Sequence, residues 1–196
     1  MYSYKNWLYI GEETLPVRWT NQFTKMKKSY ITFEVALMNT YAVEDLSKSK
    51  IIEFFKLHWG SPEMVISSGI YDCSALDGFA VLNEEEKIIG LITYLIKDNE
   101  CEIISLDSME EGKGIGTSLV QEVENLAIKK NCKIVKLITT NDNLSALKFY
   151  QKRGFILSKI IHNAVKEARK VKPEIPLIGN DGIPIRDEIE MIKVLN

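Results

Sequence analysis

Apolar residues between Cys101 and Phe155 follow first the spacing of a strand and then that of a helix. They alternate or run together in Ile103–Leu106, which indicates a strand over Cys101–Leu106. After a glycine-containing loop, one face of a predicted helix carries Leu119, Val123, Leu126 and Ala127. The same pattern predicts three further elements: a strand at Lys133–Thr139, a helix at Leu144–Arg153 and a strand at Phe155–Ile161.

Upstream, the pattern predicts a first strand at Tyr30–Leu37 and a helix at Ser47–His58. Aromatic and β-branched residues alternate in the strand, whereas apolar residues recur at helical spacing in the helix. Ser47 is a suitable N-cap, and Gly60 with the serine and proline that follow ends the helix. We expect Met64–Ile66 to form a second short helix or a loop against the core.

Two stretches, Phe79–Leu82 and Lys87–Ile96, predict a β-hairpin closed by the acidic turn Glu84–Glu86. Asp98 and Asn99 then turn the chain into the Cys101–Leu106 strand. An antiparallel meander followed by alternating helices and strands predicts an α/β (or α+β) fold with a mixed sheet.

The C-terminal part predicts a last strand at Glu188–Leu195, preceded by an insertion at residues 162–187. Within the insertion, Asn163–Val171 is predicted to be a short helix. The prolines at 173 and 176 require extended backbone before them, and Gly179–Pro184 is rich in turn residues. A connection of this length inside a compact domain is usually functional or mobile.

Composition predicts one globular domain. The chain has 196 residues, of which 45% are hydrophobic and 27% charged, so it can bury a proper core. A net charge of -2 gives no electrostatic reason to expect nucleic acid or an anionic membrane as a partner. The chain shows neither an apolar signal core nor a run long enough to span a bilayer, which predicts a cytoplasmic protein.

Residues 1–29 are predicted to be an N-terminal extension, in which 7–10 and 17–19 can pair as a hairpin, ahead of a domain at 30–196. The basic run Lys25–Lys28 is expected to be a solvated connector. Three cysteines, Cys73, Cys101 and Cys132, show no C-x-x-C spacing and no neighbouring histidine. Reduced thiols are therefore expected, with no disulfide framework and no metal site.

The stretch Glu111–Thr117 reads E-G-K-G-I-G-T and lies between a predicted strand and a predicted helix. Such a loop directs free backbone N–H groups and the positive end of the helix dipole at one point, which makes an anion site. The P-loop pattern is absent, and the dinucleotide pattern fails because its third glycine would have to be Thr117 or Leu119. Another phosphate-bearing ligand is expected.

Two motifs together resemble the GNAT superfamily of acetyl-CoA-dependent N-acetyltransferases. The loop matches the pyrophosphate pattern Gln/Arg-x-x-Gly-x-Gly/Ala of that family. Further on, Asn143–Phe155 reads N-L-S-A-L-K-F-Y-Q-K-R-G-F and matches the pattern N-x-x-A-x-x-F-Y-x-x-x-G-F. The resemblance begins near residue 30 and covers most of the chain after it. The chain departs from the family at Glu111, which stands where Gln or Arg is usual and adds a negative charge near the expected diphosphate.

The resemblance implies a mixed, mostly antiparallel twisted sheet flanked by helices, with acetyl-CoA as co-substrate. In this family the strands before and after the loop helix splay apart, and the pantetheine arm of the cofactor enters between them. The implied cofactor-binding residues are Leu106, Asp107, Ser108, Gly112, Lys113, Gly114, Ile115, Gly116, Thr117 and Asn143. Of these, residues 106–108 are expected to act through main-chain groups, and Asn143 can equally be a helix cap.

For catalysis, Tyr150 matches the position of the family's general acid, since a phenol can protonate the departing thiolate. The alternative is a buried face residue of the helix. Glu102 matches a carboxylate that deprotonates the amine through water, and its alternative is a solvated residue at the strand end. His58 could act as a base, but an exposed histidine at a helix end fits as well. No nucleophile–base pair is present, which suits direct transfer without a covalent intermediate.

The sequence therefore predicts an acetyl-CoA-dependent N-acetyltransferase that acts on a primary amine. The alternative is a non-catalytic acyl-CoA-binding or sensor module with the same fold. The acceptor stays open between protein N-terminus, lysine, polyamine, aminoglycoside and small metabolite, and transfer of a longer acyl group is a further option. A homodimer is possible.

Overall fold

The computed structural model describes residues 39–195. The predicted N-terminal hairpin and the predicted strand Tyr30–Leu37 lie outside these residues. Within the described part, no helix is long and apolar enough to cross a membrane.

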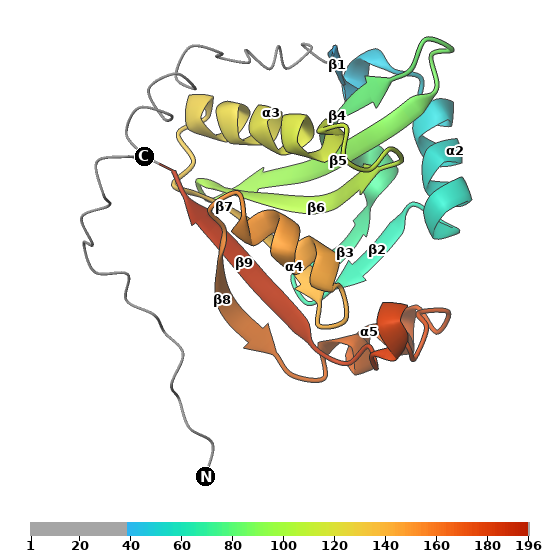
Figure 1. Cartoon of the computed structure of the whole chain (residues 1–196), viewed down its shortest axis with the longest axis vertical. Helices are drawn as coiled ribbons and strands as arrows, with labels where there is room; N and C mark the ends of the chain where they lie inside the picture. Colours follow the sequence, from blue (N-terminus) through green and yellow to red (C-terminus); the bar gives the residue numbers. More distant parts are fainter. Residues whose placement is uncertain (1–38, 196) are drawn as a thin grey trace, which may run out of the picture. The chain divides into compact units, whose positions relative to one another are not determined.

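A seven-stranded mixed sheet is the centre of the domain (Figure 1). Its strands lie in the order β1-β4-β5-β6-β7-β9-β8, and all neighbours are antiparallel except β6 and β7. The strand bounds are β1 (Thr40–Ala42), β4 (Asp77–Leu82), β5 (Ile88–Lys97), β6 (Glu100–Ser108), β7 (Ile134–Thr140), β8 (Ile156–Ile161) and β9 (Glu188–Val194). The predicted fold, a mixed and mostly antiparallel sheet with flanking helices, is confirmed.

Each face of the sheet carries its own apolar core. On one face, the helices α3 (Ile115–Lys129) and α4 (Leu144–Gln151) bury residues such as Leu119 and Tyr150 against β5, β6, β7 and β9. The other face is covered by α2 (Lys48–Trp59) and by the 3-10 turns η1 (Val43–Asp45) and η2 (Cys73–Ala75), with Phe54 and Phe55 at its centre. Burying side chains of this size stabilises the fold by about 1.5–3 kcal/mol each.

The helix α2 follows the prediction closely. Ser47 accepts a hydrogen bond from the backbone N–H of Lys50 and so caps its first turn. Gly60, with φ of 76°, ends the helix in the left-handed conformation that glycine adopts without steric cost.

Residues Met64–Ile66 do not form a helix or a loop, so that expectation is wrong. They belong to β2 (Glu63–Ile66), which pairs with β3 (Gly69–Asp72) in a separate two-stranded sheet. Cross-strand pairing with β3, which local apolar spacing does not report, decides the conformation here. Met64 and Ile66 pack on the same core as Phe54, so the hairpin lies on the α2 face.

The hairpin of β4 and β5 and the tight turn into β6 are confirmed; at that turn Asp98 and Asn99 have φ of 52° and 61°.

The pairing of β5 with β6 contains a β-bulge. In the β5–β6 pairing Thr93 lies opposite Ser105 and Tyr94 opposite Ile103, which leaves Ile104 as a bulge. Because the bulge adds one residue, it resets which side chains of β6 face α2.

At the bulge, β6 and β7 separate. Their parallel pairing runs only from Glu100–Ile134 to Ile103–Leu137. Beyond it, β6 continues beside β5 as far as Ser108, while β7 continues beside β9 as far as Thr140. Each strand thus presents one unpaired backbone edge to the gap, which is the splay that the resemblance implied.

The insertion joins β8 to its neighbour β9 and contains α5 (Ala164–Val171) and the short η3 (Asn180–Gly182). The predicted helix is confirmed. It packs beside β2, and Lys172 Nζ bonds to the carbonyl oxygen of Glu63 at 2.7 Å and to Ser61 Oγ at 3.1 Å.

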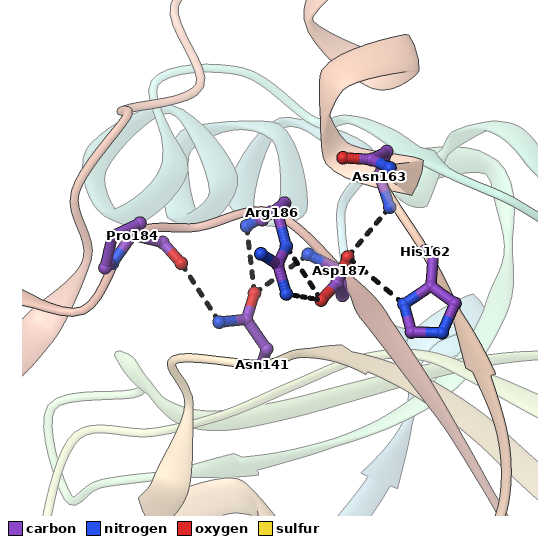
Figure 2. Close-up of polar contacts among 6 residues, drawn as sticks. All are labelled: Asn141, His162, Asn163, Pro184, Arg186 and Asp187. Carbon is purple, nitrogen blue, oxygen red and sulfur yellow. Dashed lines mark hydrogen bonds and ion pairs between the residues drawn. The ribbon is translucent and has the colours of Figure 1, made fainter.

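A polar network fastens the end of the insertion to the turn after β7 (Figure 2). Asn141 Oδ1 accepts hydrogen bonds of 2.9 Å from the backbone N–H groups of Arg186 and Asp187, and Asn141 Nδ2 donates to the carbonyl oxygen of Pro184. The Asp187 carboxylate accepts from Arg186 at 2.7 Å and from the N–H of Asn163 at 2.8 Å. This network fixes the chain on both sides of the insertion.

Candidate active site

A cleft of about 820 Å³ opens where β6 and β7 separate. It lies between the unpaired strand edges, the glycine loop and α4 on one side, and Trp59, Met64 and Ile66 on the other. The cleft brings together every predicted site residue except Glu102 and Lys113, namely Leu106, Asp107, Ser108, Gly112, Gly114, Ile115, Gly116, Thr117, Asn143 and Tyr150. Its volume is in the range typical of small-molecule sites.

The glycine loop has the geometry of an anion site. Gly112 and Gly114 have φ of 77° and 83°, values that side chains with a Cβ rarely adopt. Gly114 is the N-cap of α3 and provides no side-chain cap, so the first N–H groups of the helix have no side-chain acceptor there. Gly116 lets α3 and α4 approach closely, because a Cβ there would lie 3.3 Å from the Phe149 ring.

Arg153 brings a positive charge to the cleft beside the loop, whereas the role of Lys113 in cofactor binding stays a prediction. Lys113 Nζ is paired with Glu110 at 2.8 Å and does not line the cleft. Arg153 lines it, lies 3.5 Å above the centre of the Phe149 ring, and donates hydrogen bonds to the carbonyl oxygen of Phe149 and to Thr117 Oγ1. Sequence reasoning missed Arg153 because the N-x-x-A-x-x-F-Y-x-x-x-G-F pattern leaves position 153 open.

Asn143 is the N-cap of α4. Its Oδ1 accepts hydrogen bonds from the N–H of Ala146 at 3.1 Å and from Ser145 Oγ at 2.9 Å. The cap role is therefore real, and the side chain lines the cleft as well. A cap and a ligand contact are compatible, because the cap uses only the amide oxygen.

Tyr150 is 6% exposed and stands between the rings of Phe149 and Phe155, yet it lines the cleft. Among the described residues its hydroxyl has no hydrogen-bond partner. Burial, and next the negative charge of Asp107, raise the pKa of the Tyr150 phenol above its ordinary value, while Arg153 acts in the opposite direction. The phenol therefore holds its proton at any working pH.

Asp107 was predicted to act through main-chain groups, but its side chain is part of the cleft. The indole Nε1 of Trp59 donates a hydrogen bond of 3.0 Å to Asp107 Oδ1. Its second oxygen, Oδ2, is buried and has no hydrogen-bond partner within residues 39–195. Burial raises the pKa of the Asp107 carboxyl, and the Trp59 hydrogen bond and the charge of His58 partly offset this.

Glu102 lies outside the cleft lining and is engaged by its neighbours. It is 7% exposed, accepts a hydrogen bond of 2.6 Å from Ser68 Oγ, and lies 4.0 Å from Lys136 Nζ. The expected alternative of a solvated strand-end residue therefore does not describe it. Its role as a base stays a prediction.

Sequence reasoning did not find Glu188 as a cleft residue. It is 2% exposed, lines the cleft from β9, and accepts a hydrogen bond of 2.9 Å from the backbone N–H of Ser67. Only the pairing of β9 with β7 brings it here, so no local signal marks it.

His58 is exposed and packs on Phe54, with ring centres 4.6 Å apart, and it does not line the cleft.

The three cysteines are free and buried. Burial raises the pKa of Cys73 to about 11 and that of Cys101 to about 12. Thiols with such values are poor nucleophiles near neutral pH. Within the described residues no group of His, Cys, Asp and Glu side chains could hold a metal ion.

Comparison with known proteins gives concordant results. Residues 45–155 match the model of the acetyltransferase (GNAT) family. The uncharacterized protein YxbD of Bacillus subtilis is 54% identical over 158 residues, which are 81% of this chain and 99% of that protein. A GNAT family acetyltransferase from Elizabethkingia anophelis, solved with acetyl-CoA bound, is 26% identical with a TM-score of 0.55 over 62% of this chain and 78% of that one.

An IAA acetyltransferase from Bacillus cereus shares the fold, with a TM-score of 0.58 and 21% identity over 80% of this chain and 100% of that one. The family match spans more than half of the chain and includes the splayed strands, the glycine loop and α4. By sequence and by structure, the chain belongs to the acetyltransferase (GNAT) family.

Proposed function

We propose that the protein transfers the acetyl group of acetyl-CoA directly to a primary amine. One observation carries this proposal: the cleft joins an uncapped helix N-terminus to a pair of unpaired strand edges. The helix N-terminus suits a diphosphate, and the strand edges suit the amides of a pantetheine arm. The family membership and the acetyl-CoA in the Elizabethkingia structure support the same ligand.

In this proposal the loop residues 112–117 hold the diphosphate through backbone N–H groups, and Arg153 adds the positive charge that Glu111 does not supply. The main chain of residues 106–108 and the Asn143 amide hold the pantetheine arm. Tyr150 protonates the departing thiolate, since its phenol is kept neutral and faces the cleft.

A thiol-release assay tests the proposal directly. The full chain is mixed with acetyl-CoA and a panel of amines that includes short alkylamines, a polyamine, an aminoglycoside and a peptide with a free N-terminus. Amine-dependent release of CoA thiol is expected. Binding of acetyl-CoA by calorimetry without thiol release for any amine would indicate the non-catalytic acyl-CoA-binding module instead.

A further inference from the structure

The cleft contains one carboxylate that is fixed in place but incompletely satisfied. Trp59 holds Oδ1 of Asp107, while Oδ2 is buried and has no hydrogen-bond partner in the described part of the chain. A buried oxygen left without a donor is energetically unfavourable. Such groups are rare in native proteins and need an explanation, of which a catalytic role is one.

The backbone of β6 explains why Asp107 points to the α2 face of the sheet. The bulge at Ile104 leaves Ser105 opposite Thr93, and the two hydroxyls share a buried hydrogen bond of 2.7 Å. Two residues further on, Asp107 lies opposite Leu91 and so points to the α2 face, where Trp59 meets it. The glycine loop begins a few residues after Asp107. Asp107 therefore lies between this loop along the chain and Trp59 on α2.

The other carboxylates that line the cleft, and Glu102 outside it, are engaged or exposed. Glu102 accepts from Ser68 and lies outside the lining. Glu188 accepts from the N–H of Ser67, and Glu110 is paired with Lys113. Glu111 is exposed on the loop. Among these side chains, Asp107 alone combines a buried oxygen without a donor with a place in the same cleft lining as the proposed general acid.

Asp107 and Tyr150 also interact electrostatically, since the carboxylate charge contributes to the raised pKa of the phenol. The two groups line the same cleft from β6 and from α4. An acid and a base that face one cleft are what amine acylation requires, because one proton must leave the nitrogen and another must reach the sulfur.

We propose that Asp107 is the general base that takes a proton from the acceptor ammonium group, with Trp59 as its positioning residue. This inference rests on the proposed acetyl transfer. Asp107 removes one proton from the ammonium nitrogen, whose lone pair then forms the C–N bond to the acetyl carbon. The C–S bond breaks and Tyr150 gives its proton to the sulfur. The nitrogen loses a second proton to water, Tyr150 regains one from water, and Asp107 releases its own to solvent.

Trp59 sets both the orientation and the proton affinity of this base. Its hydrogen bond to Oδ1 favours the ionised carboxylate, whereas burial disfavours it. The ionisable groups around Asp107 are His58 on α2, Cys73 on η2, Tyr150 on α4 and, across the cleft, Glu188 on β9. Because burial is the largest influence, activity should fall on acidification at a higher pH than for an ordinary aspartate.

The test uses Asp107→Asn, while Glu102→Gln and Glu188→Gln test the two competing carboxylates. We expect Asp107→Asn to lower kcat about a hundredfold or more, the usual range for loss of a general base. Acetyl-CoA affinity by calorimetry should change by less than about threefold, and the acidic limb of the kcat profile should disappear. Trp59→Phe should retain that limb but move it to higher pH, an effect that a merely structural role would not produce.

A readout independent of turnover completes the design. In the parent, the Nε1–H resonance of Trp59 should titrate with Asp107, and in Asp107→Asn this titration should vanish. The inference is overturned if Asp107→Asn retains the parent's kcat and acidic limb, if Glu102→Gln or Glu188→Gln removes the limb instead, or if the Trp59 resonance does not titrate. Thiol release by the parent in the same assay shows that the proposed function holds even where the base assignment fails.

Discussion

Ser68 Oγ donates a hydrogen bond of 2.6 Å to Glu102 Oε1, and the N–H of the preceding Ser67 donates one of 2.9 Å to Glu188 Oε2. The two acceptors stand on β6 and β9, which are the neighbours of β7 in the sheet. The turn of the β2–β3 hairpin is therefore fastened across three strands, beside the part of the cleft that Met64 and Ile66 line.

This relationship makes Ser68→Ala a test of stability. The change leaves a buried carboxylate oxygen without its hydroxyl donor, so we expect the free energy of unfolding to fall by about 1–3 kcal/mol. Urea denaturation measures it. The control Ser49→Ala removes an exposed hydroxyl that, within residues 39–195, bonds only to Ser47, and it should cost about 0.5 kcal/mol or less. Equal stability of parent and Ser68→Ala would show that the contact contributes nothing.

Tyr150→Phe should lower turnover about a hundredfold or more and leave acetyl-CoA affinity unchanged. The substitution removes one hydroxyl that has no partner among the described residues, so packing against Phe149 and Phe155 is retained. Phe79→Leu, on the same face but outside the cleft lining, controls for general loss of aromatic packing. Parent-like turnover in Tyr150→Phe, measured where the chemical step limits the rate, would leave Tyr150 as a core residue only.

Gly114→Asp should weaken acetyl-CoA binding at least about tenfold. A Cβ at this position meets no atom within 4 Å, so the cost comes from the left-handed φ of 83° and from the new charge at the anion site. Gly182→Asp is the matched control, since its φ is 71°, its surroundings are also open, and it lies in the insertion. Calorimetry should separate the two, and equal affinities would refute the loop assignment.

The Asp187 carboxylate should make the free energy of unfolding depend on pH in the acidic range. The hydrogen bond from Arg186 first, and then that from the N–H of Asn163, lower the pKa of Asp187 to about 2, against an ordinary value of about 3.9. The ionised carboxylate thus stabilises the folded state, fully above about pH 4, and this contribution is lost as the pH falls through about 2. Urea denaturation between pH 5 and 2 should show the loss in the parent and not in Asp187→Asn. Asp181→Asn, at an exposed position of the same insertion, should behave like the parent.

The sequence was sufficient for those parts of the fold that local pattern determines. The helix after Ser47 has an apolar face, a serine cap and a terminal glycine, and each of these features predicts the same helix. The glycines before Ile115 likewise predict the loop from which α3 begins. The splay of β6 from β7 was reached only through resemblance, because it depends on where a parallel pairing ends.

The contacts of Trp59, Asp107 and Glu188 in the cleft could not be predicted from local pattern. The Trp59–Asp107 hydrogen bond joins residues 48 positions apart, and the bulge at Ile104 decides which side chains of β6 face α2. The periodicity of apolar residues predicts neither the position of the bulge nor the burial of Glu188. The prediction of a helix or loop at Met64–Ile66 was wrong for the same reason. The conformation of these residues depends on pairing with β3, which the local sequence does not report.

The insertion should influence acceptor choice through the β2–β3 hairpin. The helix α5 packs beside β2, and Lys172 Nζ bonds to the carbonyl oxygen of Glu63, one residue before Met64 in the cleft lining. Lys172→Met should therefore raise the acceptor KM or alter the acceptor profile while acetyl-CoA affinity stays unchanged. Lys170→Met is the control, because Lys170 is exposed and, in the described part of the chain, pairs only with Glu167 on the same helix.

Replacing Lys172–Pro184 by a short Gly/Asn turn is the stronger version of this experiment. The strands β8 and β9 are neighbours, so a tight turn can join them, and the Asn141 contacts to Arg186 and Asp187 stay available. Thermal unfolding first establishes that the variant is folded, which matters because Arg169 loses its bonds to Ile175 and Pro176. A folded variant with a changed acceptor profile and parent-like acetyl-CoA affinity would place acceptor choice in the insertion. If its profile matched the parent's, the insertion would be a surface flap or a contact between two copies of the chain.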